Sequence, residues 1–134
     1  MKNLKKTLII GGSSDLGKEL KKIINSKTIE LNSKDLDLSN IKEVKNFKIT
    51  TNFDNVIFFS AINKPKKFID QEDGEIERVL NVNFLSLIFL IKKIIKNNIL
   101  KKKKCNIIFI TSLYSKLARD KRFLYSLSKH ALVG

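Results

Sequence analysis

The sequence is poor in the residues that several classes of protein require. Its single cysteine, Cys105, cannot form an internal disulfide, and with one histidine it cannot supply the four ligands of a structural metal site. We therefore expect a reducing, cytoplasmic setting and no metal. The longest apolar stretch, 84–91, ends in two lysines and is too short to cross a bilayer. A glycine turn begins at Gly11, which leaves no room for a secretory signal before it.

Acidic residues are also few. The 13 acidic and 27 basic side chains give a formal charge of +14, which raises the question of a nucleic-acid partner. Only three of the cations are arginines, the residue that grips phosphates and guanines with a planar fork. The lysines are scattered, and the densest run, 101–104, is typical of a solvated turn. We predict no specific nucleic acid and no membrane as partner.

Glycine and proline are sparse, at five and one, and no linker or repeat divides the chain, so we expect one domain over residues 1–134. Short β-branched runs alternate with longer amphipathic segments, as in βαβ units. The runs are almost wholly apolar, which predicts an α/β fold with a doubly wound parallel sheet, a Rossmann fold. We predict strands at 7–10, 28–31, 56–60 and 107–111, and helices at 16–25, 75–97 and 123–133, with a weaker helix at 41–47.

The long helix predicted at 75–97 is apolar on more than one side. One set of side chains at helical spacing is expected to lie on the sheet: Leu80, Phe84, Leu87, Ile88, Ile91, Ile94 and Ile95. Val82, Leu85 and Phe89 fall on another side of the helix. A second apolar side needs a second partner, and we expect a subunit interface of a homo-oligomer there.

A glycine-rich turn, Ile10 to Gly17, joins the first predicted strand to the first predicted helix. Glycine lets the backbone approach a pyrophosphate, and the first amides of the following helix face the anion. The spacing differs from the usual G-x-G-x-x-G, and a turn of this kind can be purely structural. Its position in the fold favours a nucleotide site.

Tyr125 and Lys129 are four residues apart and lie on one face of the last predicted helix. A nearby ammonium favours phenolate over phenol, so the tyrosine could exchange a proton with an alcohol or carbonyl. Among so many lysines a Tyr-x-x-x-Lys arises by chance about one time in three, so the pair alone is weak. Ser112, at the end of the last strand, could hydrogen-bond a substrate oxygen, although a serine there is usually a turn residue. Asn83 is an unusual residue for an apolar helix interior.

Together these motifs have a recognisable order, and the chain resembles the short-chain dehydrogenase/reductase family along its whole length. The resemblance rests on the ordered set Gly11-x-x-x-Asp15-Leu16-Gly17, Asp37-Leu38-Ser39, Phe59-Ser60-Ala61, Val82-Asn83-Phe84, Thr111-Ser112 and Tyr125-x-x-x-Lys129.

The resemblance implies a role for each motif. Tyr125 would be the general acid/base and would also contact the coenzyme, and Lys129 would lower the pKa of Tyr125 and bind the nicotinamide ribose. Ser112 would steady the substrate oxygen, and Asn83 would hold a water in the proton relay to Lys129. The pyrophosphate and adenosine ribose of the coenzyme would contact Gly11, Ser13, Ser14, Leu16 and Gly17. The adenine would contact Asp37 and Leu38, and the other face of the ribose would contact Phe59, Ser60 and Ala61. The reaction would be hydride transfer between a nicotinamide and a small-molecule carbonyl or alcohol.

The sequence departs from the family pattern at two informative places. The segment 58–61, Phe-Phe-Ser-Ala, replaces Asn-Asn-Ala-Gly, which removes amides that tie the central strands together. At the end of the second strand, Asn32 and Ser33 followed by Lys34 favour NADP(H) over NAD(H), although Glu30 keeps NAD(H) open.

Family members continue for roughly another hundred residues beyond this point of the fold, with two more strands. We therefore expect an N-terminal portion of a longer protein, a Rossmann fold incomplete at its C-terminal end, whose strand at 107–111 is a bare sheet edge. Two further hypotheses stay open: a non-catalytic NAD(P)-binding fragment or regulatory protein of the same fold, and weak, nonspecific association with nucleic acid.

Overall fold

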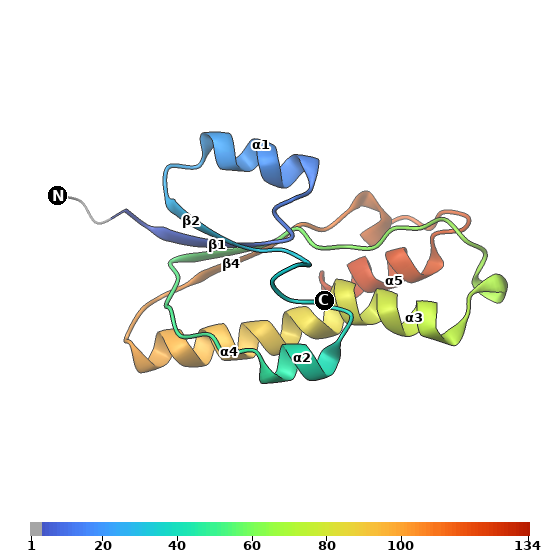
Figure 1. Ribbon diagram of the computed structural model, residues 1–134. Coiled ribbons are helices and arrows are strands. Elements are labelled where there is room, and N and C mark those ends of the chain that lie inside the picture. The colour runs from blue at the N-terminus through green and yellow to red at the C-terminus, as the bar shows by residue number, and fades with distance from the viewer. Residues whose placement is uncertain (1–3) are drawn as a thin grey trace.

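A computed structural model describes residues 4–134 and shows a parallel sheet with helices on both faces (Figure 1). Each of the four predicted strands and each predicted helical segment is present, with ends that differ by a few residues. The strands and α-helices are, in chain order, β1 (Lys6–Ile10), α1 (Asp15–Ile23), β2 (Lys27–Leu31), α2 (Ile41–Asn46), β3 (Asn55–Phe58), α3 (Asp73–Leu80), α4 (Ser86–Leu100), β4 (Asn106–Phe109) and α5 (Phe123–Ala131).

Side chains at the helix starts explain where these helices begin. The Ser14 hydroxyl accepts a hydrogen bond from the Gly17 amide at 3.2 Å and caps α1. The Asn40 side chain does the same for α2 through the Glu43 amide at 3.2 Å. A capping box between Glu72 and Glu75 starts α3. Each cap satisfies an amide that the first turn of a helix leaves without a partner.

The sheet has the strand order β2-β1-β3-β4, and all three strand pairs are parallel. The chain runs from β1 outward to β2 and then returns to the other side of β1 to form β3. Between β1 and β3 the winding therefore reverses, and in open parallel sheets ligands bind beyond the carboxyl ends of the strands at this point. The order confirms the predicted doubly wound α/β architecture.

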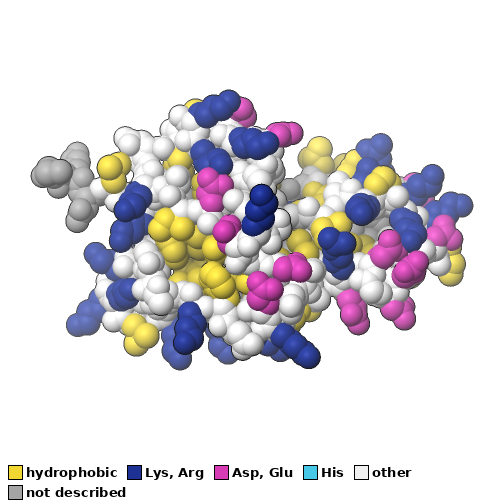
Figure 2. Space-filling view, in the orientation of Figure 1, with side chains coloured by type: hydrophobic (Ala, Val, Ile, Leu, Met, Phe, Trp, Pro, Cys, Tyr) yellow, Lys and Arg dark blue, Asp and Glu magenta, His cyan; other side chains and the backbone are white. Residues whose placement is uncertain are grey.

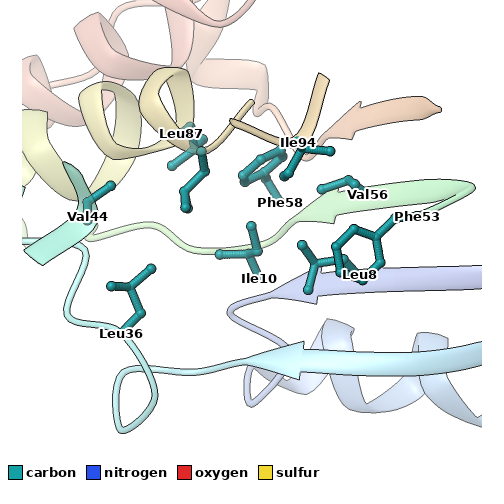
Figure 3. Close-up of a cluster of buried hydrophobic side chains, with 10 residues drawn as sticks. Leu8, Ile10, Leu36, Val44, Phe53, Val56, Phe58, Leu87 and Ile94 are labelled. Atoms are coloured by element: carbon teal, nitrogen blue, oxygen red, sulfur yellow. The ribbon is translucent and has the colours of Figure 1, made fainter. Parts of the chain in front are cut away.

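The main core lies between the sheet and the layer formed by α2 and α4 (Figure 3). Alternate residues of β1 and β3 point into it, and α4 supplies the opposing side chains. The members are Leu8, Ile10, Leu36, Val44, Phe53, Val56, Phe58, Leu87, Leu90 and Ile94. The other face of β1 lies under α1, where Ile9 is fully buried. With helices on both faces, central strands must be apolar at every position, as their sequences are.

The predicted long helix is continuous but contains a π-helical turn, Asn81–Leu85, between α3 and α4. The predicted sheet-facing set of this helix is partly wrong: Ile88 and Ile95 are 45% and 41% exposed, while Leu90 and Asn98 are buried. Polar anchors set the rotation of α4. The Ser86 hydroxyl donates to the Leu38 carbonyl at 2.6 Å, and the Asn98 amide donates to the Phe53 carbonyl at 2.6 Å. Both side chains must face inward to make these bonds.

The predicted second apolar side of the same helix does not form one surface. Val82 lines a groove, Phe89 packs on the core and lies 4.9 Å from the Lys45 ammonium, and Leu85 is 40% exposed. The subunit interface expected there stays a prediction.

Strand β4 has one neighbour, β3, and forms the edge of the sheet, as predicted. Ile108, which pairs with Ile57, is 43% exposed. Within residues 4–134, no helix is long and apolar enough to span a membrane, and no group of His, Cys, Asp and Glu side chains could hold a metal ion.

Candidate active site

The turn after β1 brings backbone from two strands into close contact. Gly11 has φ +78°, and a Cβ atom built there would lie 2.6 Å from the Ser60 nitrogen at the end of β3. A Cβ atom on Gly17 would lie 2.7 Å from the Gly12 oxygen. Both positions therefore require glycine, the first for its conformation and for space, the second for space. The turn therefore packs directly against the backbone at the end of β3.

A groove of about 360 Å³ opens beyond the carboxyl ends of β1, β2 and β3, at the point where the winding reverses. Ten of the predicted coenzyme-binding residues line it: Gly11, Ser13, Ser14, Asn32, Ser33, Asp37, Leu38, Phe59, Ser60 and Ala61. Leu16 and Gly17 do not line it, and neither do Tyr125 and Lys129, the other two predicted coenzyme contacts. Leu16 is 57% exposed on the first turn of α1, and Gly17 is buried beneath Gly12.

At the β2 end of the groove, Asn32 connects the strand to the glycine turn. Its side-chain oxygen accepts a hydrogen bond from the Ser13 backbone amide at 3.1 Å, and its backbone amide donates to the Asp35 carboxylate at 2.8 Å. Glu30 is turned away toward α1 and does not line the groove. Its carboxylate pairs with the Lys21 ammonium at 2.8 Å, and this bond, helped by Asn32, lowers the pKa of Glu30.

Asp37 supplies the acidic group that does line the groove. The Ser39 hydroxyl and amide donate to its carboxylate at 2.7 and 2.9 Å, and these bonds lower the pKa of Asp37. The positive charge of Arg78 adds to this effect from α3. Sequence reasoning missed Arg78 and Val82 as groove residues, because both come from the long helix, whose rotation was not known.

Two of the predicted catalytic residues, Tyr125 and Lys129, lie near each other, and Lys129 also bonds to the strand end that precedes Ser112. Lys129 is 3% exposed, and its ammonium donates to the Ile110 carbonyl, two residues before Ser112, at 2.7 Å. The same nitrogen lies 5.7 Å from the centre of the Tyr125 ring. The Ser112 hydroxyl accepts a hydrogen bond from the Tyr114 amide at 3.3 Å, and the Tyr114 and Tyr125 rings meet edge to face at 6.1 Å.

Asn83 lies in the π-helical turn, fully buried, and connects two segments. Its side-chain oxygen accepts from the Ile62 amide at 2.7 Å, and its nitrogen donates to the Ile62 carbonyl at 3.0 Å and to the Ser128 hydroxyl at 2.9 Å. Ile62 lines the groove, and Ser128 precedes Lys129 in α5. One amide thus fixes the groove wall against the helix that carries Tyr125 and Lys129.

Replacing Asn83 by alanine should lower the free energy of unfolding by about 2–4 kcal/mol, because the Ile62 amide and carbonyl and the Ser128 hydroxyl would lose their partner in a buried site. Urea unfolding measures the change. Asn81→Ala is the matched control, since within residues 4–134 the Asn81 side chain makes a single hydrogen bond, to the Ser39 carbonyl. Equal losses in the two variants would contradict the role given to Asn83.

Burial lowers the pKa of the Lys129 ammonium, because the charged form loses its hydration. The unfolded chain, with a lysine pKa near 10.5, then binds more protons than the folded chain in the window below that value. The free energy of unfolding should therefore rise with pH through this window. Lys129→Met lacks the group, so the stability of the wild type relative to this variant should increase from about pH 7 to about pH 10. Urea unfolding at both pH values tests this, and a constant or shrinking difference would contradict it.

The segment 58–61, which departs from the family pattern, makes an aromatic contact in the structure. Phe58 stacks on Phe109 of β4 with ring centres 5.2 Å apart, so an aromatic contact joins β3 to β4 where the family uses amides. The backbone bonds around it persist, from Phe59 to the Ile10 carbonyl at 2.8 Å and from Ile110 to the Phe58 carbonyl at 3.2 Å. The Ser60 hydroxyl is buried and has no hydrogen-bond partner within the described residues. Ser60 lines the groove, but this oxygen itself lies beneath the groove surface.

Comparison with known proteins agrees with this geometry. The family model for short chain dehydrogenases matches residues 6–134, and the chain therefore belongs to the short-chain dehydrogenase family. No curated protein sequence gives a significant match.

Solved structures with the same fold include a 4-hydroxyisoleucine dehydrogenase complexed with NADH and succinate, which is 26% identical with a TM-score of 0.81. A short chain dehydrogenase from Leptospira borgpetersenii with bound NAD+ is 23% identical, with a TM-score of 0.84. An Agrobacterium tumefaciens protein with bound NADP is 19% identical, with a TM-score of 0.79. These alignments cover 96%, 98% and 97% of this chain and 68%, 62% and 62% of the respective structures. The chain thus spans about two thirds of their length.

Proposed function

We propose that this chain carries the coenzyme groove and the catalytic side chains of an NAD(P)-dependent oxidoreductase that acts on a small carbonyl or alcohol compound. The observation that carries the proposal is the connection between the two parts of the site. The Ile62 backbone on the groove wall is bonded to Asn83, and Asn83 is bonded to the helix that carries Tyr125 and Lys129. A ligand in the groove would therefore reach toward the phenol.

The residues fit a dinucleotide. Gly11, Ser13 and Ser14 line the groove beside the first turn of α1, where the helix dipole favours an anion such as a pyrophosphate. Ser60 and Ala61 line the same wall. When bound, the nicotinamide supplies or accepts the hydride.

Within this proposal the protein's own side chains handle the proton. Tyr125 exchanges it with the substrate oxygen, and the buried Lys129 places a positive charge beside the tyrosine ring. The Ser112 hydroxyl hydrogen-bonds the substrate oxygen as charge develops there. Both N–H groups of the Asn83 side chain are already engaged, so we assign Asn83 a positioning role. The water relay through Asn83 stays a prediction, as do a cytoplasmic location and a homo-oligomer.

Incubating the protein with a reduced nicotinamide coenzyme and a panel of aldehydes and ketones tests the proposal, with coenzyme oxidation followed by absorbance. Turnover of any carbonyl compound above a no-substrate control is the expected result. Coenzyme binding without turnover of any of them would favour the second candidate, a non-catalytic NAD(P)-binding protein. The replacement of both family amides by Phe58 and Phe59 is the observation that favours that alternative.

For the coenzyme, we propose NADP(H) ahead of NAD(H). Glu30 is held by Lys21 outside the groove, so Asn32 and Ser33, rather than a carboxylate, line the β2 end where a 2′-phosphate would lie. Ser33→Asp should weaken NADPH binding by about tenfold or more and leave NADH binding less affected, because the new carboxylate repels the 2′-phosphate. Calorimetric titration measures both. Asn25→Asp, an equal charge change at an exposed site outside the groove, is the control. Equal weakening of the two coenzymes by Ser33→Asp would contradict the assignment.

A further inference from the structure

A second, smaller cavity lies beside Tyr125, between the segment after β3, helix α3 and the start of α5. Its volume is about 120 Å³, the space of about four water molecules in the liquid, which suits a small chemical group. Ile62 and Arg78 line both this cavity and the coenzyme groove, so the two are neighbours. With Tyr125 in its wall, the cavity is placed to hold part of a substrate whose oxygen reaches the phenol.

The polar lining of this cavity is mostly cationic. Its charged members are Lys64, Lys66, Arg78, Lys121 and Arg122, with Glu75 as the one carboxylate. Glu75 is already paired with Lys66, and this hydrogen bond lowers the pKa of Glu75 and raises that of Lys66. The cavity wall therefore carries five cations and one carboxylate; the charge of Lys64 also acts on Glu75, and that of Arg78 acts on Asp37 in the neighbouring groove. Asp70 and Glu72 act on Lys66 from nearby but do not line the cavity. Figure 2 shows acidic and basic side chains side by side at the end of the molecule that holds the start of α3.

One of these cations is held in place before any ligand arrives. The Arg122 guanidinium donates to the Asn63 carbonyl at 3.0 Å and to the Asn63 side-chain oxygen at 2.6 Å. Arg122 is also the residue from which α5 starts, and no side chain caps that end. Within residues 4–134, no acceptor is recorded for the first amides of α5, those of Phe123, Leu124 and Tyr125. The positive end of a nine-residue helix therefore adds to the side-chain charge.

Apolar side chains complete the wall. Ile62, Val79 and Leu124 line the cavity, and Leu124 is 4% exposed. Charges beside such a wall interact more strongly than charges in open water, because fewer water molecules screen them. The combination of an excess of cations over carboxylates, helix amides without an acceptor and an apolar wall suits a carboxylate or a phosphate group.

We propose that this cavity binds the anionic group of the substrate, so that the carbonyl or alcohol compound on which Tyr125 acts carries a carboxylate or a phosphate. The inference rests on the proposed function and specifies its substrate class. The anionic group enters between Lys64, Lys121 and the start of α5, and the reacting carbon then lies between Tyr125 and the groove.

Direct titration tests this without a known substrate. The probes are succinate for the carboxylate arm and inorganic phosphate for the phosphate arm, with neutral succinamide as the control ligand. Binding is followed by the backbone amide resonances of 123–125 and by calorimetry. We expect saturable binding of at least one anion, no binding of succinamide, and weakening by added salt. Saturation that leaves the resonances of 123–125 unmoved would overturn the proposal, and so would equal binding of succinamide.

A matched pair of double variants assigns the site. Lys64→Gln with Lys121→Gln should raise the dissociation constant of the bound anion by about fivefold or more. Lys103→Gln with Lys104→Gln removes the same charge from an exposed turn outside the cavity and should change it little. Equal effects of the two pairs would mean that net charge alone attracts the anion, and would overturn the proposal.

Titrating the same variants with NADPH separates the two levels of inference. Neither Lys64 nor Lys121 lines the coenzyme groove, so the affinity for NADPH should be unchanged. NADPH binding without anion binding would remove the substrate class and leave the proposed function standing. Anion binding without NADPH binding would remove the proposed function instead.

Discussion

Replacing Tyr125 by phenylalanine should reduce carbonyl turnover by about 10²–10⁴-fold, the contribution of a positioned general acid. The substitution removes one oxygen and keeps the ring, which packs edge to face on Tyr114 at 6.1 Å. The fold and the coenzyme affinity should therefore be retained. Initial rates with the best substrate of the carbonyl panel, compared with NADPH affinity by calorimetry, measure the two effects separately.

The control for this variant is the second tyrosine of the chain. The Tyr114 hydroxyl is bonded to Arg119 on the surface, and we give it no part in catalysis. Tyr114→Phe should leave turnover nearly unchanged. Full activity in Tyr125→Phe, or an equal loss in both variants, would show that the proton comes from another group.

Replacing Gly11 by alanine should lower the free energy of unfolding by about 2–4 kcal/mol. The φ of +78° disfavours any side chain, and the new Cβ atom would lie 2.6 Å from the Ser60 nitrogen, which belongs to backbone and cannot move aside cheaply. The turn and the end of β3 would have to separate. Because both line the groove, affinity for a dinucleotide should fall together with stability.

Gly74→Ala is the matched control, because a Cβ atom on Gly74 meets nothing within 4 Å and the residue lies in α3. Alanine favours a helix over glycine by about 0.5–1 kcal/mol, so this variant should be more stable than the wild type. Urea unfolding of both variants gives the comparison. A Gly11→Ala protein as stable as Gly74→Ala would contradict the close contact between the turn and β3.

The strands and most helix limits could be predicted because their signals are local. Apolar runs such as 7–10 indicate a strand buried on both faces, and amphipathic segments such as 16–25 indicate a helix. Alternation of strands and helices then restricts the topology to a parallel sheet. The exposed edge at β4 is expected on a different ground, the family resemblance, because family members add two more strands beyond this point.

The rotation of α4 could not be predicted because it depends on contacts with distant segments. Apolar spacing alone placed Ile88 and Ile95 inside, but both are half-exposed. The buried face is instead set by Ser86 and Asn98, which bond to the backbone at Leu38 and Phe53. Polar residues that reach carbonyls far away in sequence give no periodic signal.

Some residues of the candidate site could likewise be predicted from the sequence, and others could not. The glycine turn and the residues at the strand ends could be located from the sequence, because ligands of parallel sheets bind beyond those ends. Arg78 could not, and neither could the cationic cavity, because its cations come from three separate segments and look like scattered surface lysines in the sequence. Only folding brings Lys64 and Lys121 beside Tyr125.

We propose that the groove at the winding reversal binds a nicotinamide dinucleotide. The decisive experiment is a titration of the isotopically labelled chain with NADPH, followed by its backbone amide resonances. We expect saturable chemical-shift changes in the amides of 11–14, 32–33 and 59–61, the segments that contribute to the groove wall. Shifts that stay linear with concentration, or that concentrate on surface lysines such as 101–104, would show that only the positive charge of the chain attracts the coenzyme.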